Sequence, residues 1–154
     1  MTQHKNLLLK NQLCFALYAA TNSIIRYYRI YLNEIGITYT QYLVLLVLWE
    51  LENCSIKKIA TVLKLDSPTI TPIVQKLEKL NLVTRKRSKE DERIVVVSLT
   101  QSGLDLEGQV ADIQSKVACK THLKNKDFNE LKESLNQLAE TMTKKEKKLD
   151  SLLK

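Results

Sequence analysis

Apolar side chains recur at helical spacing along most of this chain. They recur every three to four residues over 7–32, which predicts one long amphipathic helix. A second helix is predicted over 39–52, with Thr38 as its N-cap. Helical spacing returns after Thr100 and continues toward the end of the chain, with a break at 124–127. The pattern therefore predicts a mainly α-helical protein with long helices at both ends.

The middle of the chain predicts two short helices joined by a tight turn. Apolar residues recur at helical spacing over 55–63 and again over 67–81. Asp66, or the residue after it, can cap the second of these helices. Pro68 falls in the first turn, where a missing N–H is harmless, but Pro72 falls one turn later. We expect Pro72 to cost one backbone hydrogen bond or to cause a slight kink. This layout is typical of a helix-turn-helix.

The next segment has strand propensity. Residues 82–84 and 93–99 are β-rich, and the segment 85–92 between them is almost wholly charged. This predicts a β-hairpin with a charged tip, which is the wing of a winged helix-turn-helix. The run 94–97 is apolar without alternation, so we expect helices to cover one face of the hairpin. The predicted fold class is mainly α with a small β-hairpin wing.

The flanking helices suggest self-association. We expect a single domain over 1–154 with the winged helix-turn-helix at 55–99. The helices predicted at 7–34 and 101–153 carry more apolar surface than the winged motif could cover. Dimerisation through these helices would bury the excess, so we expect a homodimer.

Composition limits the classes of protein to consider. The chain has 154 residues, 44% of them apolar, with only three Gly and two Pro, which fits one globular domain of long elements. No run approaches the roughly 20 apolar residues of a membrane span, so we expect no membrane partner. Cys14, Cys54 and Cys119 are isolated and accompany only two histidines, which excludes a zinc finger. We expect no metal or cofactor, and an odd cysteine count without a credible signal peptide indicates the reducing cytoplasm.

Positive charge is concentrated in the predicted winged motif. The whole chain carries 24 basic and 17 acidic residues, and residues 55–99 alone hold ten basic against five acidic residues. Double-stranded DNA is therefore the expected partner. The start of the second short helix and the hairpin are the parts that contact DNA in such motifs. The candidate DNA-binding residues are Ser67, Thr69, Thr71, Gln75 and Lys76 of the helix and Arg85, Lys86, Arg87 and Arg93 of the hairpin, with Asp91 expected to hold an arginine in position.

Local motifs resemble a known family. The segments 85–88 and 91–93, followed by 95–100, resemble the wing signature of MarR-type winged-helix transcription regulators. The segments 11–18 and 37–50 are similar to the organic-hydroperoxide-sensing, OhrR-like subgroup. The resemblance implies a cytoplasmic homodimer, in most cases a repressor, that binds a pseudo-palindromic operator when reduced and releases it when Cys14 is oxidised by organic hydroperoxide.

The sequence departs from this family at two positions. Pro68 and Asn81 stand where close relatives usually carry glycine. Asn81 can still adopt the left-handed conformation that ends a helix, whereas Pro68 would alter how the chain enters the recognition helix.

The resemblance also assigns roles around the thiol. It implies that Tyr28 and Tyr39 donate hydrogen bonds to the thiolate of Cys14, and that Cys119 is the resolving thiol of an intersubunit disulfide. Tyr28 follows Cys14 by 14 residues, which is about 21 Å along a helix at 1.5 Å per residue. The tyrosine must therefore come from the partner subunit. We expect Cys54 to be incidental.

Other functions remain open at this point. A thiol peroxidase with Cys14 as nucleophile is disfavoured, because neither a histidine nor an acidic base lies near it in sequence. The protein could be a MarR-type regulator released by a small phenolic ligand, with inert cysteines. It could also be an interaction module that binds no DNA, in which case it would lack the steep salt dependence of phosphate binding.

Overall fold

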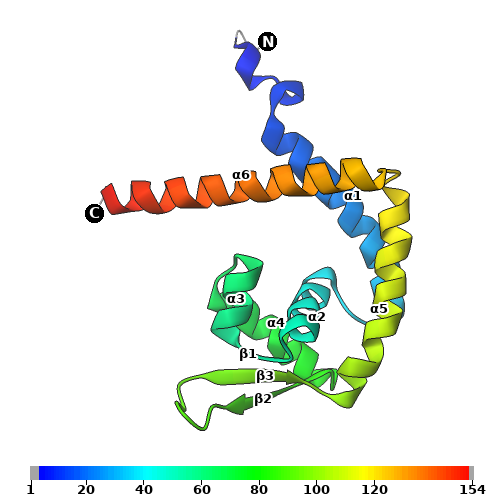
Figure 1. The fold of residues 1–154 in the computed structure, drawn as a ribbon, viewed down its shortest axis with the longest axis vertical. Coiled ribbons are helices and arrows are strands. Elements are labelled where there is room, and N and C mark those ends of the chain that lie inside the picture. Colours follow the sequence, from blue (N-terminus) through cyan, green and yellow to red (C-terminus); the bar gives the residue numbers. More distant parts are fainter. Residues whose placement is uncertain (1–3, 153–154) are drawn as a thin grey trace. The chain divides into compact units, whose positions relative to one another are not determined.

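The computed structural model describes residues 4–152, and their side chains as far as residue 145. The chain divides into two compact units, Met1–Val117 and Ala118–Lys154, which are described separately. The architecture is mainly α, as predicted, with a small three-stranded antiparallel sheet that contains the predicted hairpin (Figure 1). In chain order the regular elements are α1 (Leu13–Glu34), α2 (Tyr39–Leu51), β1 (Asn53–Ser55), α3 (Ile56–Leu63), α4 (Ser67–Lys79), β2 (Val83–Arg87), β3 (Val95–Leu99), α5 (Gln101–Lys120) and α6 (Asn125–Leu152).

The first helix begins later than the apolar spacing predicts. Residues 5–11 form two short 3₁₀ turns, and α1 begins only at Leu13. Asn11 Nδ2 donates to the carbonyl of Lys5 at 2.7 Å, and the Gln12 side chain donates to the carbonyl of Asn6. Side-chain bonds to nearby carbonyls compete with the helix for the backbone. The prediction of one helix from residue 7 was therefore wrong at its start.

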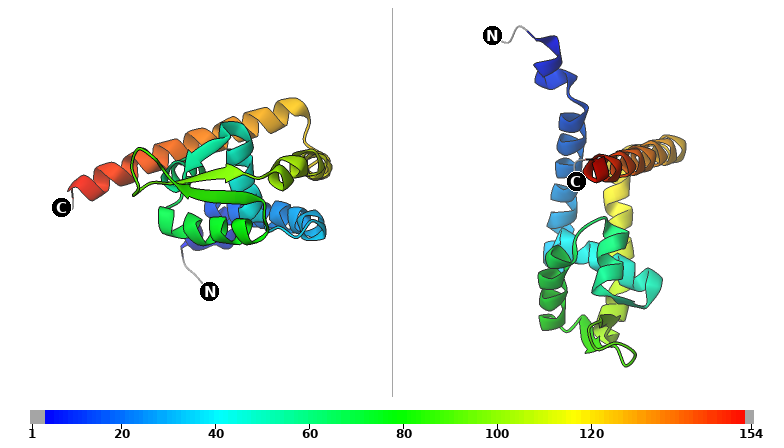
Figure 2. Two further views of the ribbon diagram at one scale, coloured as in Figure 1. Left: turned by 90° about the horizontal axis from the view of Figure 1, so that it is seen from below. Right: turned by 90° about the vertical axis from the view of Figure 1, so that its left-hand side faces the viewer.

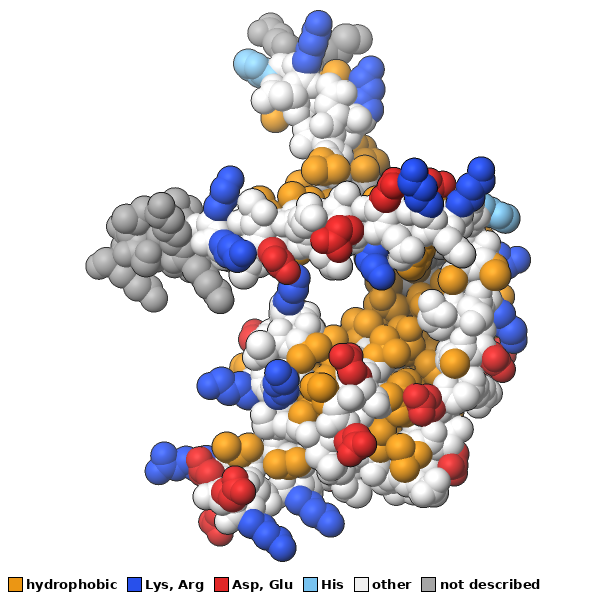
Figure 3. Space-filling view, viewed as in Figure 1, with side chains coloured by type: hydrophobic (Ala, Val, Ile, Leu, Met, Phe, Trp, Pro, Cys, Tyr) orange, Lys and Arg blue, Asp and Glu red, His pale blue; other side chains and the backbone are white. Residues whose placement is uncertain are grey.

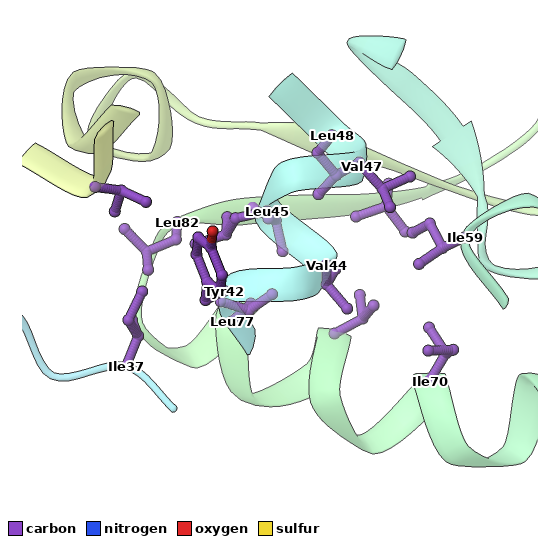
Figure 4. Packing of buried hydrophobic residues seen from close by; sticks show 14 of the residues in the cluster. Ile37, Tyr42, Val44, Leu45, Val47, Leu48, Ile59, Ile70, Leu77 and Leu82 are labelled. Atoms are coloured by element: carbon purple, nitrogen blue, oxygen red, sulfur yellow. The ribbon is translucent and has the colours of Figure 1, made fainter. Parts of the chain in front are cut away.

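The second helix forms the centre of the first unit. Thr38 caps α2 as predicted, in a capping box with Gln41, whose side chain accepts from the Thr38 N–H at 2.7 Å. Both faces of α2 are apolar because it packs between several neighbours. Figure 4 shows its buried side chains meeting those of α3 and α4, including Leu45, Ile59 and Ile70, each fully buried.

The sheet contains a strand that the sequence did not predict. Residues 53 and 54 were expected only to separate the helices predicted over 39–52 and 55–63, but Asn53–Ser55 form β1, which pairs with β3 in antiparallel register, with Cys54 opposite Val97. The strand order is β1-β3-β2, so β3 is central, and Figure 2 shows the β2–β3 ribbon running alongside α4. Val97 is fully buried, which explains the apolar run in this strand.

The last two helices follow the predicted pattern. α5 ends at Lys120 and α6 begins at Asn125, close to the expected break at 124–127. In the second unit, α6 exposes apolar side chains spaced alternately three and four residues apart. None of the helices within the described residues is long and apolar enough to cross a membrane. The exposed apolar residues of α6 are Phe128, Leu131, Leu135, Leu138 and Met142.

Candidate functional site

The fourth helix presents a polar face to solvent because its apolar residues lie on the other side. Ile70, Val74 and Leu77 are fully buried against the core. Pro72 lies inside α4, and the helix continues through it although proline has no N–H to donate to the carbonyl one turn earlier. The predicted DNA-binding side chains of this helix are all at least partly exposed: Ser67, Thr69, Thr71, Gln75 and Lys76.

The start of this helix is held by its cap. Asp66 is the N-cap, and its Oδ1 accepts from the Thr69 N–H at 2.8 Å. Hydrogen bonds from Thr69 hold the pKa of Asp66 below its ordinary value. Thr71 Oγ1 donates to the Ser67 carbonyl at 2.9 Å, so its hydroxyl hydrogen is already used and its oxygen is left as an acceptor. At the other end Asn81 adopts the expected left-handed conformation, with φ of 56°.

A charged pair joins α4 to strand β2 of the wing. Glu78 Oε2 accepts from Arg85 Nε at 2.7 Å and from Arg85 Nη2 at 2.6 Å, while Glu78 Oε1 accepts from the Arg85 backbone N–H at 3.2 Å. These bonds hold the pKa of Glu78 below its ordinary value. Sequence reasoning missed Glu78, and the structure shows that the guanidinium of Arg85 is occupied inside the protein. Contact between Arg85 and DNA stays a prediction.

The wing tip carries the exposed cations. Lys86, Arg87 and Arg93 are exposed. Arg87 Nη1 donates to the Glu92 carbonyl at 2.6 Å, which braces the two arms of the hairpin. Asp91 contacts Arg93 through its backbone, because Asp91 Oδ1 accepts from the Arg93 N–H at 2.9 Å. The guanidinium of Arg93 forms no ion pair with the described residues. Figure 3 shows that basic and acidic side chains project side by side around the wing.

Three tyrosines form one cluster between α1 and α2. The ring centroids lie 5.3 Å apart for Tyr28 and Tyr39, 5.1 Å for Tyr28 and Tyr42, and 5.7 Å for Tyr39 and Tyr42. Burial raises the pKa of both Tyr39 and Tyr42, and the neighbouring Tyr28 raises it further. The phenols of Tyr39 and Tyr42 therefore stay protonated and can act as hydrogen-bond donors. Tyr42 is a member that the sequence analysis did not assign to the site.

The three cysteines lie in different surroundings. Cys14 is exposed in the first turn of α1, and Cys119 is exposed near the end of α5, in the second unit. Cys54 is buried in β1, and burial raises the pKa of its thiol. Tyr28 and Cys14 lie on the same continuous helix. The separation of about 21 Å expected from 14 residues therefore holds, and Tyr28 cannot reach the thiol of its own chain.

A pocket of about 390 Å³ opens between α2 and α5. Tyr42 and Trp49 line it from α2, so the pocket shares one ring with the tyrosine cluster. Trp49 Nε1 donates to the Gly103 carbonyl at 3.0 Å and so fixes the two helices together beside it. The remaining lining residues are Leu46, Glu50, Glu107, Val110, Ala111 and Gln114.

Sequence and structure comparisons find transcription regulators that are similar to this chain. A family model described as transcriptional regulator SarA/Rot matches residues 26–109. The organic hydroperoxide resistance transcriptional regulator of Bacillus subtilis is 43% identical over 137 residues, which cover 89% of this chain and 93% of that protein. The chain belongs to the MarR-type winged-helix transcription regulators, in their organic-hydroperoxide resistance subgroup.

Solved structures extend the match to this regulator's fold. The structure of reduced AbfR bound to DNA superposes with a TM-score of 0.78 at 32% identity and covers 92% of this chain and 97% of that one. A structure of disulfide-formed AbfR superposes with a TM-score of 0.63 at 34% identity, covering 88% of this chain and 90% of that one. The winged-helix fold and the family resemblance predicted from the sequence are thus confirmed.

Proposed function

We propose that this MarR-type regulator is a homodimeric repressor that binds DNA through α4 and the wing and releases its operator when organic hydroperoxide oxidises Cys14. Oxidation ends in an intersubunit disulfide between Cys14 and Cys119. The observation that carries the sensing role is the cluster of phenols at Tyr28, Tyr39 and Tyr42. The name of the 43% identical relative gives the class of oxidant.

Exposure and charge support the DNA-binding role. The exposed hydroxyl, amide and ammonium groups of α4 can contact base edges in a major groove. Lys86 and Arg87 are exposed and can contact backbone phosphates, and the exposed Arg93 can enter a narrow minor groove. The superposable structure of reduced AbfR was solved with DNA.

Exposed apolar surface supports the dimer. The heptad-like spacing on α6 is that of helices which pack against one another. The segment around the start of α1 is also apolar and exposed, at Leu9, Leu13 and Tyr18. The proposed second copy supplies the Cys14 that meets the tyrosine cluster, because Tyr28 cannot reach the cysteine of its own chain along α1.

The chemistry balances with two thiols and one hydroperoxide. The thiolate of Cys14 attacks the terminal oxygen of the hydroperoxide, the O–O bond breaks, and the alkoxide leaves as an alcohol after taking a proton. Cys14 is then a sulfenic acid. The thiolate of Cys119 attacks the Cys14 sulfur, an S–S bond forms, and the hydroxide leaves as water after taking a proton. The phenols stabilise the Cys14 thiolate by donating hydrogen bonds.

The test is DNA binding of the reduced protein to a duplex from upstream of its own gene, measured by fluorescence anisotropy. Cumene hydroperoxide should abolish binding, and dithiothreitol should restore it. Cys14→Ser should bind DNA and ignore the oxidant, whereas Cys54→Ala, the matched control at the buried thiol, should respond as wild type does. If the wild-type protein never binds the duplex, or if Cys14→Ser still responds, the proposal fails.

Non-reducing electrophoresis tests the disulfide separately. A dimer-sized band should appear after oxidation and be absent in both Cys14→Ser and Cys119→Ser. A band that persists in Cys119→Ser removes Cys119 as the resolving thiol and leaves the sensing role of Cys14 intact.

The pocket between α2 and α5 favours a second candidate function, a regulator released by a small phenolic ligand. Its aromatic lining at Tyr42 and Trp49 fits a flat ring. In that case salicylate should release DNA from the Cys14→Ser variant, and hydroperoxide should leave the wild-type complex unchanged.

A further inference from the structure

A second cavity lies beneath the wing, where the two short helices begin. Its volume is about 290 Å³. Ser55 and Lys57 line it from the start of α3, Ser67 from the start of α4, and Arg93 from the wing. Apolar side chains complete the walls: Ile56, Ile94 and Val95. The cavity thus joins three parts of the winged motif that are separate in sequence.

All charge on the lining is positive. Lys57 and Arg93 are its two charged residues, and the acidic residues of the wing, 90–92, are absent from the lining. Among the described residues, neither cation forms an ion pair. Two cations on partly apolar walls, neither of them in an ion pair with a described carboxylate, favour an anion in the space between them.

Two hydroxyl groups can complete an anion site. Ser55 Oγ accepts from the Lys58 N–H at 3.1 Å, so its hydrogen stays available for donation. The Ser67 hydroxyl has no hydrogen-bond partner among the described residues. The cavity can therefore offer O–H donors as well as ammonium and guanidinium groups, a combination that suits phosphate oxygens.

We propose that this cavity seats one backbone phosphate of bound DNA, with Lys57 as its principal ligand. The inference rests on the proposed DNA-binding function and deepens it. The sequence analysis did not single out Lys57, because it lies outside both the recognition helix and the wing. A phosphate held here would fix α3 and the wing on the same DNA strand, so Lys57 would supply affinity without reading sequence.

The salt dependence of binding tests this role. Reduced wild-type protein, Lys57→Ala, Lys57→Arg and Lys58→Ala are titrated against the upstream duplex and against a scrambled duplex of equal length. Lys58 is the matched control, because it is the next residue, is exposed, carries the same charge and does not line the cavity. Thermal unfolding of each variant confirms that the fold is retained.

Each lost phosphate contact lowers the slope of log K against log salt by about 0.9, and the Lys57→Ala dimer loses one contact per protomer, so its slope should fall by about 1.8. Between about 50 and 200 mM salt, Lys57→Ala should therefore lose roughly 12-fold less affinity than wild type. The loss of affinity should be equal on both duplexes, Lys57→Arg should keep the wild-type slope, and Lys58→Ala should change it less. Equal salt slopes for Lys57→Ala and Lys58→Ala would overturn the phosphate site. A loss of affinity confined to the upstream duplex would also overturn it. In both cases the DNA-binding function would stand. Absence of wild-type binding to either duplex would overturn both.

Discussion

Gly103 is the point where α5 meets the base of the wing, and replacing it with alanine should destabilise the first unit. A Cβ at this position would lie 2.1 Å from the Leu82 carbonyl oxygen and 3.1 Å from Leu99 Cδ2. Ordinary contact begins at 3.4 Å, so the backbone would have to open by more than 1 Å. The obstructing oxygen cannot easily give way, because it accepts from the Thr100 N–H at 3.0 Å.

The expected magnitude follows from two opposing effects. Overpacking against rigid neighbours costs about 1–3 kcal/mol, whereas alanine in place of glycine in a helix gains roughly 1 kcal/mol. Gly108, on the same helix, is exposed, and a Cβ added there would meet nothing within 4 Å, so Gly108→Ala isolates the favourable effect. For a chain of this size each kcal/mol shifts Tm by about 2–4 °C.

Circular dichroism melts of the reduced protein provide the measurement. Gly108→Ala should melt above wild type and Gly103→Ala below it. If Gly103→Ala melts at or above Gly108→Ala, the steric reasoning is refuted and the close approach of α5 to Leu82 is not rigid.

Three further predictions concern charge. Glu78→Gln should reduce the loss of Tm in acid. The Arg85 pair lowers the pKa of Glu78 in the folded protein, so the ionised pair stabilises the fold above pH 4.5, the ordinary pKa of a glutamate, and this stabilisation is lost as the pH falls further. Equal acid profiles for wild type and variant would contradict this. Tyr42→Phe should reduce the loss of Tm above pH 10. Burial raises the pKa of Tyr42, so above the ordinary value of 10.0 the unfolded chain loses this proton more readily than the folded protein does, and the folded state of the wild type is destabilised. Absorbance at 295 nm follows the titration of the tyrosines. Arg93→Ala should weaken DNA binding, measured by fluorescence anisotropy, by roughly 1–3 kcal/mol, because the Arg93 guanidinium forms no ion pair within the described residues and is available to DNA, whereas Lys126→Ala on α6 should leave the affinity unchanged.

The parts of the fold set by local interactions could be predicted from the sequence. Thr38 caps α2 and Asp66 caps α4, because a cap needs only the residue and the helix that follows it. The hairpin was predictable for the same reason, since a charged tip between β-branched runs is a local pattern. The limit appears at β1, where three residues form a strand only because β3 lies beside them.

The candidate site was predictable as a set of residue types and less so as a set of contacts. The family resemblance indicated Tyr28 and Tyr39, and the structure adds Tyr42 to the same cluster. The basic wing was visible as a charge run, but nothing local distinguishes Arg85, which is bound to Glu78, from Arg93, whose guanidinium forms no ion pair within the described part of the chain. That distinction depends on a neighbour seven residues away across the junction of helix and strand.

By itself the sequence determined the helical class, the winged motif, the family and the positions of the thiols, because each follows from spacing, capping or a contiguous motif. Only the tertiary structure decided which cations are free, which tyrosines share an environment, and that Lys57 of α3 and Arg93 of the wing line one cavity. Exposure and ion pairing are properties of a residue's surroundings, and those surroundings come from segments that the chain brings together only on folding.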